Sequence, residues 1–158
     1  MVVTMNAEDT TLLRQLLHGS RVLALGVLVD GAPYVGLLPY ASSADHRALL
    51  VHASGLARHT RGLADGAPFS ALVHGPEADA PDPLQVPRVT LQGTVHRLEP
   101  GTGAHAEGRA RYEDRFPDSA QTFELPDFSL YALRITEGRL VAGFARARNV
   151  SPGDLATL

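Results

Sequence analysis

Residues suited to anion binding are concentrated in the segment Ser54–Leu63, which reads Ser-Gly-Leu-Ala-Arg-His-Thr-Arg-Gly-Leu. Arg58, His59, Thr60 and Arg61 fall in the first turns of a predicted helix. Cations at that end oppose the helix dipole and destabilise the helix by roughly 0.3–1 kcal/mol each. The arrangement becomes favourable when an anion is bound, because free N–H groups, two guanidinium groups and a hydroxyl can together hold a phosphate. The alternative is an exposed polar face on which the arginines pair with nearby acids.

A second motif resembles a dinucleotide-binding fingerprint. Gly101–Ala106 matches G-x-G-x-x-[G/A], follows a predicted strand and opens a predicted helix, and Glu124 lies about twenty residues further on. The preceding strand alternates apolar and polar residues, however, and Pro117 and Pro126 interrupt the chain after the helix. No parallel strand can complete a βαβ unit, so we predict that no dinucleotide binds there.

Other catalytic patterns are missing from the sequence. The histidines occur in no H-x-H, H-x-x-H or H-E-x-x-H arrangement, so no metal site is predicted. There is no G-x-S-x-G motif, which disfavours a serine hydrolase. No side chain stands out as an acid or base catalyst, and we therefore assign no catalytic residue.

The composition narrows the function classes further. The 158 residues are 44% apolar and 20% charged, as expected of one globular domain, and they include no Cys, which excludes disulfides and thiol chemistry. All fourteen basic residues are Arg, which excludes Schiff-base chemistry; coding bias explains the missing Lys better than selection for anion binding. The net charge of −3 without a basic tail argues against a nucleic-acid partner. Without a visible signal peptide or membrane span, we expect a cytoplasmic protein with no membrane partner.

Periodicity and turn residues place these motifs on short elements. Helices are predicted at residues 8–18, 56–64 and 103–116. Strands are predicted at residues 22–29, 34–40, 48–53, 69–74, 86–98, 128–135 and 139–144, with an exposed loop at 75–83 and a turn at Glu137-Gly138 between the last two strands. Helices do not alternate with strands, so an antiparallel barrel decorated by helices fits better than a parallel sheet.

Four stretches of the chain together resemble the pyridoxamine 5'-phosphate oxidase-like FMN-binding split barrels. They are Tyr34–Tyr40, Leu49–Leu63 with its Leu-Ala-Arg-His-Thr-Arg-Gly-Leu helix, Pro87–Gly93, and Val141–Ala147. The last two are similar to the branch related to haem-utilisation proteins. The resemblance covers roughly residues 9–147, and the helix motif and the Arg88 strand are its most specific parts.

The resemblance implies a mainly β fold: a six-stranded antiparallel split barrel of Greek-key type with about three short helices. It implies a single FMN-binding domain over residues 1–148, with a loose tail at 149–158, and a homodimer that acts on a small-molecule substrate. The residues that would bind FMN are the backbone of Gly36, Leu37 and Leu38, the adjoining His52 and Ala53, the phosphate and ribityl ligands Arg58, His59, Thr60 and Arg61, and Arg88 and Gln92, which would face the flavin from the other subunit.

Two residues depart from the family's usual pattern, since Gly36 stands where relatives often have Ser and Gly62 replaces an Asn. The primary interpretation is an FMN-dependent small-molecule oxidoreductase in which the protein positions the flavin. One alternative is a haem-binding or haem-degrading protein that uses His52, His74 or His96 as axial ligand. Another is a non-catalytic carrier of flavin or a similar ligand.

Overall fold

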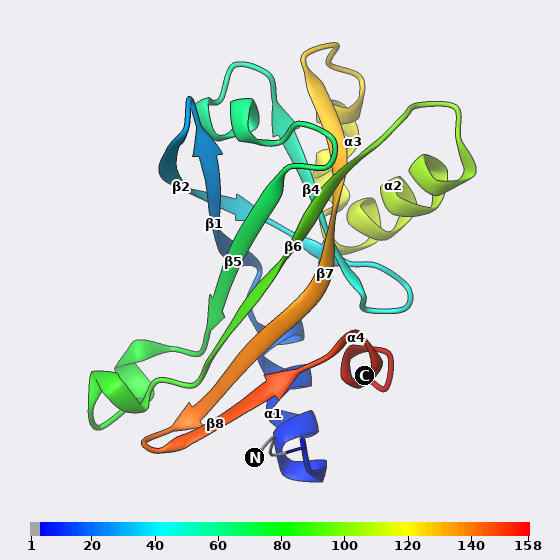
Figure 1. Ribbon diagram of the computed structural model, residues 1–158. Helices are drawn as coiled ribbons and strands as arrows, with labels where there is room; N and C mark the ends of the chain where they lie inside the picture. The colour runs from blue at the N-terminus through cyan, green and yellow to red at the C-terminus, as the bar shows by residue number, and fades with distance from the viewer. Residues whose placement is uncertain (1–3) are drawn as a thin grey trace.

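The computed structural model describes residues 4–158 as one curved antiparallel sheet with helices at one side and one end (Figure 1). The strands are β1 (Val22–Val29), β2 (Ala32–Pro39), β3 (Ala41–Ser42), β4 (Ala48–Ser54), β5 (Pro68–His74), β6 (Arg88–Leu98), β7 (Phe128–Gly143) and β8 (Arg146–Val150). The α-helices are α1 (Ala7–Gly19), α2 (Gly103–Arg115), α3 (Ala120–Phe123) and α4 (Pro152–Leu155). Short 3-10 helices are η1 (Arg58–Gly62), η2 (Glu77–Asp79), η3 (Pro83–Gln85) and η4 (Pro117–Ser119). None of the helices described is long and apolar enough to cross a membrane.

The mainly β antiparallel prediction is confirmed, but the count of six strands is wrong. Eight strands form one sheet in the order β2-β1-β5-β6-β7-β4-β3, with β8 added beside β7. Hydrogen bonds do not close the sheet, because β2 and β3 lie at opposite ends of this order. These two strands are nevertheless consecutive in the chain, with only Tyr40 between them, so the chain itself joins the two ends of the sheet.

Tyr40 is fully buried at this corner. Its hydroxyl donates a hydrogen bond of 2.6 Å to the carbonyl of Leu17, near the end of α1, and the guanidinium of Arg115 lies 4.9 Å from its ring centroid. Arg115, at the end of α2, also donates to the carbonyls of Leu17, His18 and Ser20. The ends of two helices are therefore tied to the residue that links β2 to β3.

The predicted turn at Glu137-Gly138 is wrong, because β7 passes through it as one strand of 16 residues. Gly138 has no positive φ. A Cβ there would lie 2.7 Å from Leu91 Cδ2, so this glycine permits close strand packing and does not make a turn. The turn lies further on, at Gly143 and Ala145, whose φ angles are 140° and 60°.

The helices at 8–18 and 103–116 are confirmed, as α1 and α2, and each has a polar cap. The helix predicted at 56–64 is instead the five-residue 3-10 helix η1. Ser54 does not cap it, since its hydroxyl donates to Asp127 at 2.7 Å and accepts from the Leu56 amide. Without a capping side chain, the segment forms i to i+3 hydrogen bonds, such as the one from the Thr60 amide to the Ala57 carbonyl.

The C-terminal residues are not loose, contrary to the sequence prediction. Strand β8 pairs with β7, Leu155 of α4 is fully buried, and Arg148 forms an ion pair of 3.1 Å with the buried Asp9 of α1. The sequence signal was weak because this order depends on contacts with α1, far away in the chain.

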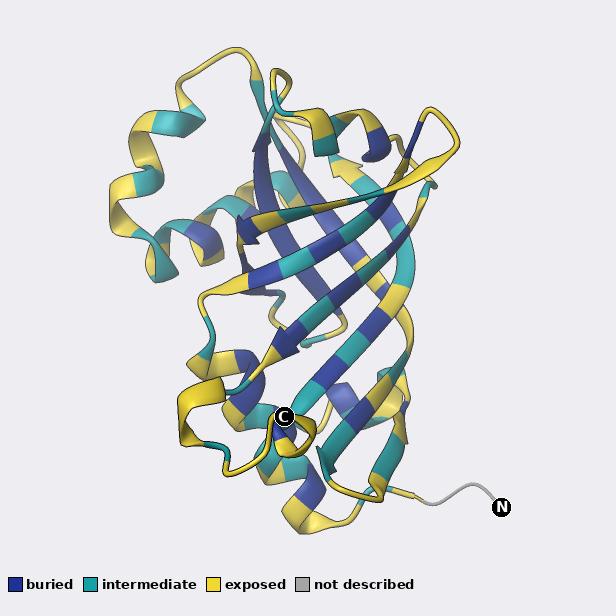
Figure 2. Cartoon of the chain, turned by 90° about the vertical axis from the view of Figure 1, so that its left-hand side faces the viewer, coloured by how far each residue is buried: buried dark blue, intermediate teal, exposed yellow. Residues whose placement is uncertain are grey.

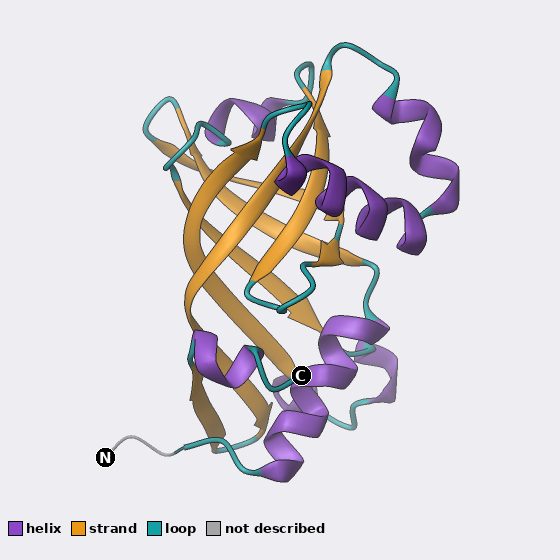
Figure 3. Ribbon diagram, turned by 90° about the vertical axis from the view of Figure 1, so that its right-hand side faces the viewer, coloured by secondary structure: helices purple, strands orange, loops and turns teal. Residues whose placement is uncertain are grey.

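The sheet has two differently covered sides. Its inner side forms the main core, and a second apolar cluster lies between β4, β7 and α2. Helices α2 and α3 lie against one side of the sheet, while α1 and α4 lie at one end (Figure 3). The outward side of β1 and β2 has exposed residues along it (Figure 2), and none of the helices in residues 4–158 covers it.

Candidate functional site

The structure brings part of the predicted phosphate segment against β2. The Arg58 guanidinium lies 5.3 Å from the ring centroid of Tyr34. The His59 ring occupies the space beside Gly36, where a Cβ would lie only 2.8 Å from Nδ1. A serine at position 36 would therefore displace this ring. Arg58, His59 and Gly36 thus form one cluster, which requires glycine at position 36 because a side chain there would collide with the His59 ring.

Arg61 is already engaged by a carboxylate. Its guanidinium donates to both oxygens of Asp30, at 2.8 and 2.7 Å, in a pair whose side chains are 57% and 66% exposed. Asp30 is held in the β1–β2 turn with a φ of 52°, followed by Gly31 at 77°. The sequence-based alternative, an arginine paired with a nearby acid, is therefore correct for Arg61. The sequence indicates the Asp-Gly turn between the two strands but does not identify Asp30 as the acid that pairs with Arg61.

The rest of η1 is held in place by backbone contacts. The Thr60 hydroxyl donates to the Ser54 carbonyl at 2.6 Å, and Gly62 lies so close to β1 that a Cβ would be 2.6 Å from Val27 Cβ. An asparagine at position 62 would not fit in this space between η1 and β1. A cavity of about 510 Å³ is lined by Thr60, Arg61 and Arg97, among others.

The other predicted flavin residues are divided between the two sides of the sheet. Leu38 and Ala53 are buried in the core, while Leu37, 70% exposed, points to the opposite side of its strand. Strand register places Gln92 and Arg88 on that same opposite side, but on β6, separated from β2 by β1 and β5. Within one chain, Arg88 and Gln92 do not meet the η1 cluster.

Exposed apolar and polar side chains share this side of the sheet, which we call the outer face. In antiparallel pairs, directly opposed residues point to the same side. The register gives two rows, Val35–Gly26–Ser70–Gln92 and Leu37–Ala24–Leu72–Thr90, and beyond them the pair His74–Arg88. The outer face is therefore apolar along β1 and β2 and polar along β6.

His74 lies on the outer face with its ring in a defined tautomer. Its Nδ1 lies 2.6 Å from the carbonyl oxygen of Gly75, which can only accept, so Nδ1 carries the proton and donates it. The Nε2 lone pair of this exposed side chain is left for a metal ion, because a hydrogen bond at one ring nitrogen fixes the other as the ligand. Directly opposite in the ladder stands Arg88, which donates to the Val86 carbonyl at 3.0 Å.

His52, which the resemblance places beside the flavin, is a buried residue in this structure. It is only 9% exposed, and its ring stacks on Phe123 with centroids 3.8 Å apart. The Thr122 hydroxyl donates to Ser119 and lies 3.2 Å from His52 Nδ1, so it accepts from the ring. Burial lowers the pKa of His52 to about 4. His52 is therefore a neutral member of an aromatic cluster beneath α3, a role that β-strand alternation alone did not reveal.

Comparisons with known proteins show which molecules share this architecture. No protein-family model matches the chain. Over 127 residues it is 27% identical to the haem oxygenase HutZ of Vibrio cholerae, covering 80% of this chain and 71% of HutZ. A haem-binding protein from Mycobacterium smegmatis has a TM-score of 0.82 at 27% identity, covering 99% of this chain and 62% of that one. A Clostridium acetobutylicum protein of the pyridoxinephosphate oxidase family, related to general stress protein 26, has a TM-score of 0.67 at 12% identity, covering 96% and 99%.

The chain has the fold of the pyridoxine phosphate oxidase family. It shares this fold with haem-binding and HutZ-like proteins, to which it is also similar in sequence. The likeness to the Clostridium protein, at 12% identity, concerns the fold alone. The chain spans 62% of the length of the Mycobacterium protein.

The buried His52 predicts a loss of stability in mild acid. The unfolded state binds a proton near pH 6.5, whereas the folded state resists protonation until about pH 4. The free energy of unfolding is therefore highest above pH 6.5 and falls as the pH drops to about 4, by about 3 kcal/mol at 1.36 kcal/mol per unit of pKa difference.

Denaturant unfolding at several pH values measures this dependence. His52→Phe removes the titrating group and should flatten the curve between pH 6.5 and 4, whereas His74→Gln, at an exposed position, should not. An unchanged slope in His52→Phe would contradict the assignment.

Proposed function

We propose that this chain binds haem on its outer face, with His74 Nε2 as the axial ligand of the iron. The observation that carries the proposal is the 2.6 Å hydrogen bond that His74 Nδ1 donates to the Gly75 carbonyl, which keeps the ring proton on Nδ1 and leaves Nε2 for the metal. Haem also needs an apolar surface for the macrocycle and cations for its propionates. The outer face supplies Leu72 next to His74 on β5, and Arg88 directly opposite it.

Two further observations support haem rather than another ligand. The relatives that match in sequence, HutZ and the Mycobacterium protein, are named for haem chemistry and haem binding. The other histidines considered as ligands fit less well: His52 is enclosed by aromatic rings, and Nε2 of His96 lies 3.1 Å from the Thr94 hydroxyl.

The residues of the outer face would bind and orient the group, while the haem itself would supply any redox chemistry. His74 would hold the iron, Arg88 would neutralise a propionate, and the apolar β1–β2 half would exclude water. No carboxylate or second histidine stands beside His74 in the ladder to transfer a proton, so we propose binding and no degradative step.

We further propose that two copies of the chain pair through the apolar half of the outer face. Val35 is 66% and Leu37 70% exposed, on adjoining rows of a sheet side that no helix of the described chain covers. Covering them removes apolar area from water, a gain of roughly 25 cal/mol per Å². In such a dimer, Arg88 and Gln92 of one copy would face the other.

The axial role of His74 predicts a loss of haem affinity in His74→Ala. Ferric haem titrated into the parent protein should give a sharp Soret band. The variant should bind more than about 10-fold more weakly, because even the loss of a residue that only hydrogen-bonds to a metal ligand costs that much. Added imidazole should restore the band if His74 is the ligand. It would not restore the band if the substitution only damaged the structure.

His96→Ala serves as the matched control and should titrate like the parent. If His74→Ala retains the parent's Soret band and affinity, another ligand holds the iron.

The dimer predicts a sedimentation mass of twice the chain mass of 16.8 kDa at micromolar concentration. Leu37→Arg places a charge in the proposed interface and should give the monomer mass. Leu125→Arg, at a 46% exposed position in the loop before β7, should leave the dimer intact. A parent protein that sediments as a monomer would refute the proposal.

Flavin binding is a second candidate, favoured by one observation. Unlike Arg61, Arg58 has no carboxylate partner among the residues that the structure describes, and its guanidinium lies against the Tyr34 ring, next to Thr60. Arg58 can therefore still take the phosphate of FMN. Such a flavin would supply electron transfer, with this chain orienting it.

Arg58→Ala should lower FMN affinity by about 10- to 150-fold, since a charge-assisted hydrogen bond contributes roughly 1.5–3 kcal/mol. Riboflavin, which lacks the phosphate, should bind parent and variant equally. Arg61→Ala, whose guanidinium Asp30 already holds, should have the smaller effect. Loss of both flavins together, or of neither, would show that Arg58 binds no phosphate.

A further inference from the structure

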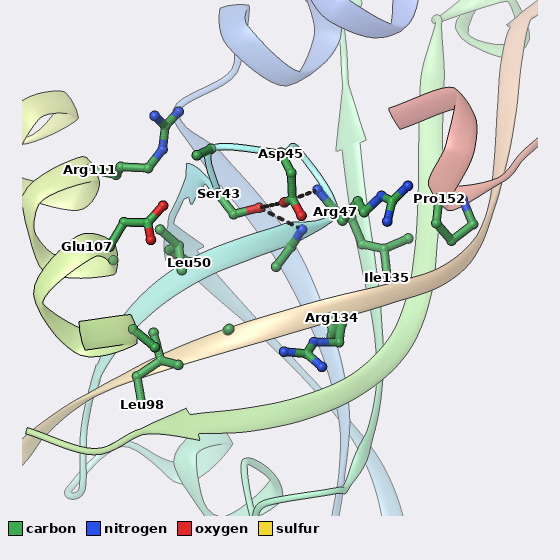
Figure 4. A pocket seen from close by; sticks show the side chains of 15 residues that line it. Ser43, Asp45, Arg47, Leu50, Leu98, Glu107, Arg111, Arg134, Ile135 and Pro152 are labelled. Carbon is green, nitrogen blue, oxygen red and sulfur yellow. Dashed lines mark hydrogen bonds between the residues drawn. The ribbon is translucent and has the colours of Figure 1, made fainter. Parts of the chain in front are cut away.

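A separate cavity lies beneath α2, over β4 and β7, on the same outward side of the sheet as the outer face but away from β1, β2 and β5. It has a volume of about 620 Å³ and is lined by the β3–β4 loop, β7, α2 and the start of α4 (Figure 4). We call it the α2 cavity. Its volume lies within the roughly 300–1,000 Å³ typical of small-molecule sites. None of the haem or flavin candidate residues lines it.

The floor of the α2 cavity is apolar. Leu50 of β4, Ala132 and Ile135 of β7, and Leu98 of β6 line it, and the first three are at most 7% exposed. Leu50, Ala132 and Leu98 belong to the apolar cluster between the sheet and α2, whereas Ile135 belongs to the main core. A ligand seated here would cover apolar surface that the cluster leaves facing the cavity.

The rim of the cavity is charged, with an excess of arginine. Arg47 and Arg134 form no side-chain hydrogen bond or ion pair with any residue in 4–158, and Arg111 uses only its Nε, on the Ser42 carbonyl at 2.8 Å. Glu107 likewise forms no ion pair or side-chain hydrogen bond with any residue in 4–158. Figure 4 shows it across the hollow from Arg134.

The other acid at the rim, Asp45, is committed to its own loop. It accepts hydrogen bonds from the Ser43 hydroxyl at 2.8 Å and from the Arg47 amide at 3.0 Å. Three guanidinium groups therefore face one unengaged carboxylate, and the rim favours an anion.

We propose that the α2 cavity binds a small amphipathic carboxylate, with its apolar body on the Leu50–Leu98–Ala132 floor and its carboxylate held by Arg134 and Arg47. Guanidinium groups present a planar fork that matches a carboxylate. The β-ladder brings the backbones of the two arginines close together, since Arg134 pairs with Ala48, the neighbour of Arg47, and both residues line the cavity. Glu107 opposes the ligand's charge and limits its affinity.

The test titrates dodecanoate, below its micelle concentration, into the ¹⁵N-labelled full chain. Amide shifts should map to residues 43–48, 104–111 and 132–135. Arg134→Gln should weaken binding by about 10-fold, and Glu107→Gln should tighten it. Arg139→Gln is the matched control on the same strand, because Arg139 lies outside the cavity and donates to Asn149 at 2.6 Å. It should bind like the parent.

A second variant fills the cavity without touching the core. Ala104 is exposed at the rim on α2, so Ala104→Phe should fold normally and lose dodecanoate binding. Because haem is itself an amphipathic carboxylate, His74→Ala should leave dodecanoate binding unchanged, and Arg134→Gln should leave the haem titration unchanged.

Three results would overturn the proposal. Dodecan-1-ol binding as tightly as dodecanoate would show that the arginines play no part. Dodecylammonium binding more tightly would give the recognition to Glu107. Displacement of dodecanoate from residues 43–48 by one equivalent of haem would identify the α2 cavity as the haem site.

Discussion

The buried Tyr40 side chain fixes where the two ends of the sheet meet. The strands that it joins, β2 and β3, lie at opposite ends of the strand order, so the sheet must curve until one residue can connect them. Burial raises the pKa of Tyr40 to about 12, which keeps the hydroxyl protonated and able to donate to Leu17. Arg115 covers the ring and donates to backbone carbonyls at the end of α1. With this corner in place, β2 has one side in the core and the other in solvent.

That curvature separates the molecule's chemistry into two regions. The outer face joins an apolar half on β1 and β2 to a polar end on β6, with His74 and Arg88 side by side. Further along the same outward side of the sheet, α2 rests on β4 and β7 and leaves a cavity with an apolar floor and arginines at its rim. An amphipathic anion suits both regions, but only the outer face offers an imidazole nitrogen to a metal ion.

Much of the fold could be predicted from the sequence, because it depends on local signals. The leucines of α1 have helical spacing, and Asp30-Gly31 is a two-residue hairpin turn. The errors arose where contacts between residues far apart in the chain determine the local structure. Gly138 was predicted to form a turn, yet it lies within β7, where the lack of a side chain lets Leu91 pack closely against it. The C-terminal segment carries little periodicity of its own and is ordered by Arg148 on Asp9.

The candidate site likewise depends partly on local signals in the sequence and partly on contacts between distant elements. The sequence indicated that Arg58, His59 and Gly36 belong together, and the structure brings them together. It could not indicate that Asp30 would engage Arg61 or that Phe123 would enclose His52, since both partners come from other elements. Departures from the flavin pattern have a physical explanation: Gly36 makes room for the His59 ring, and Gly62 allows η1 to contact β1.

The most direct test of haem binding on the outer face is a paramagnetic one. Ferric haem added to the ¹⁵N-labelled chain broadens the amide signals nearest the iron, whatever the effect of any mutation. Iron bound at His74 should broaden the signals of His74, Gly75 and Arg88 across the ladder most strongly, with the effect fading toward α2. Broadening centred on α2 and the β3–β4 loop, or on β4 around His52, would contradict it.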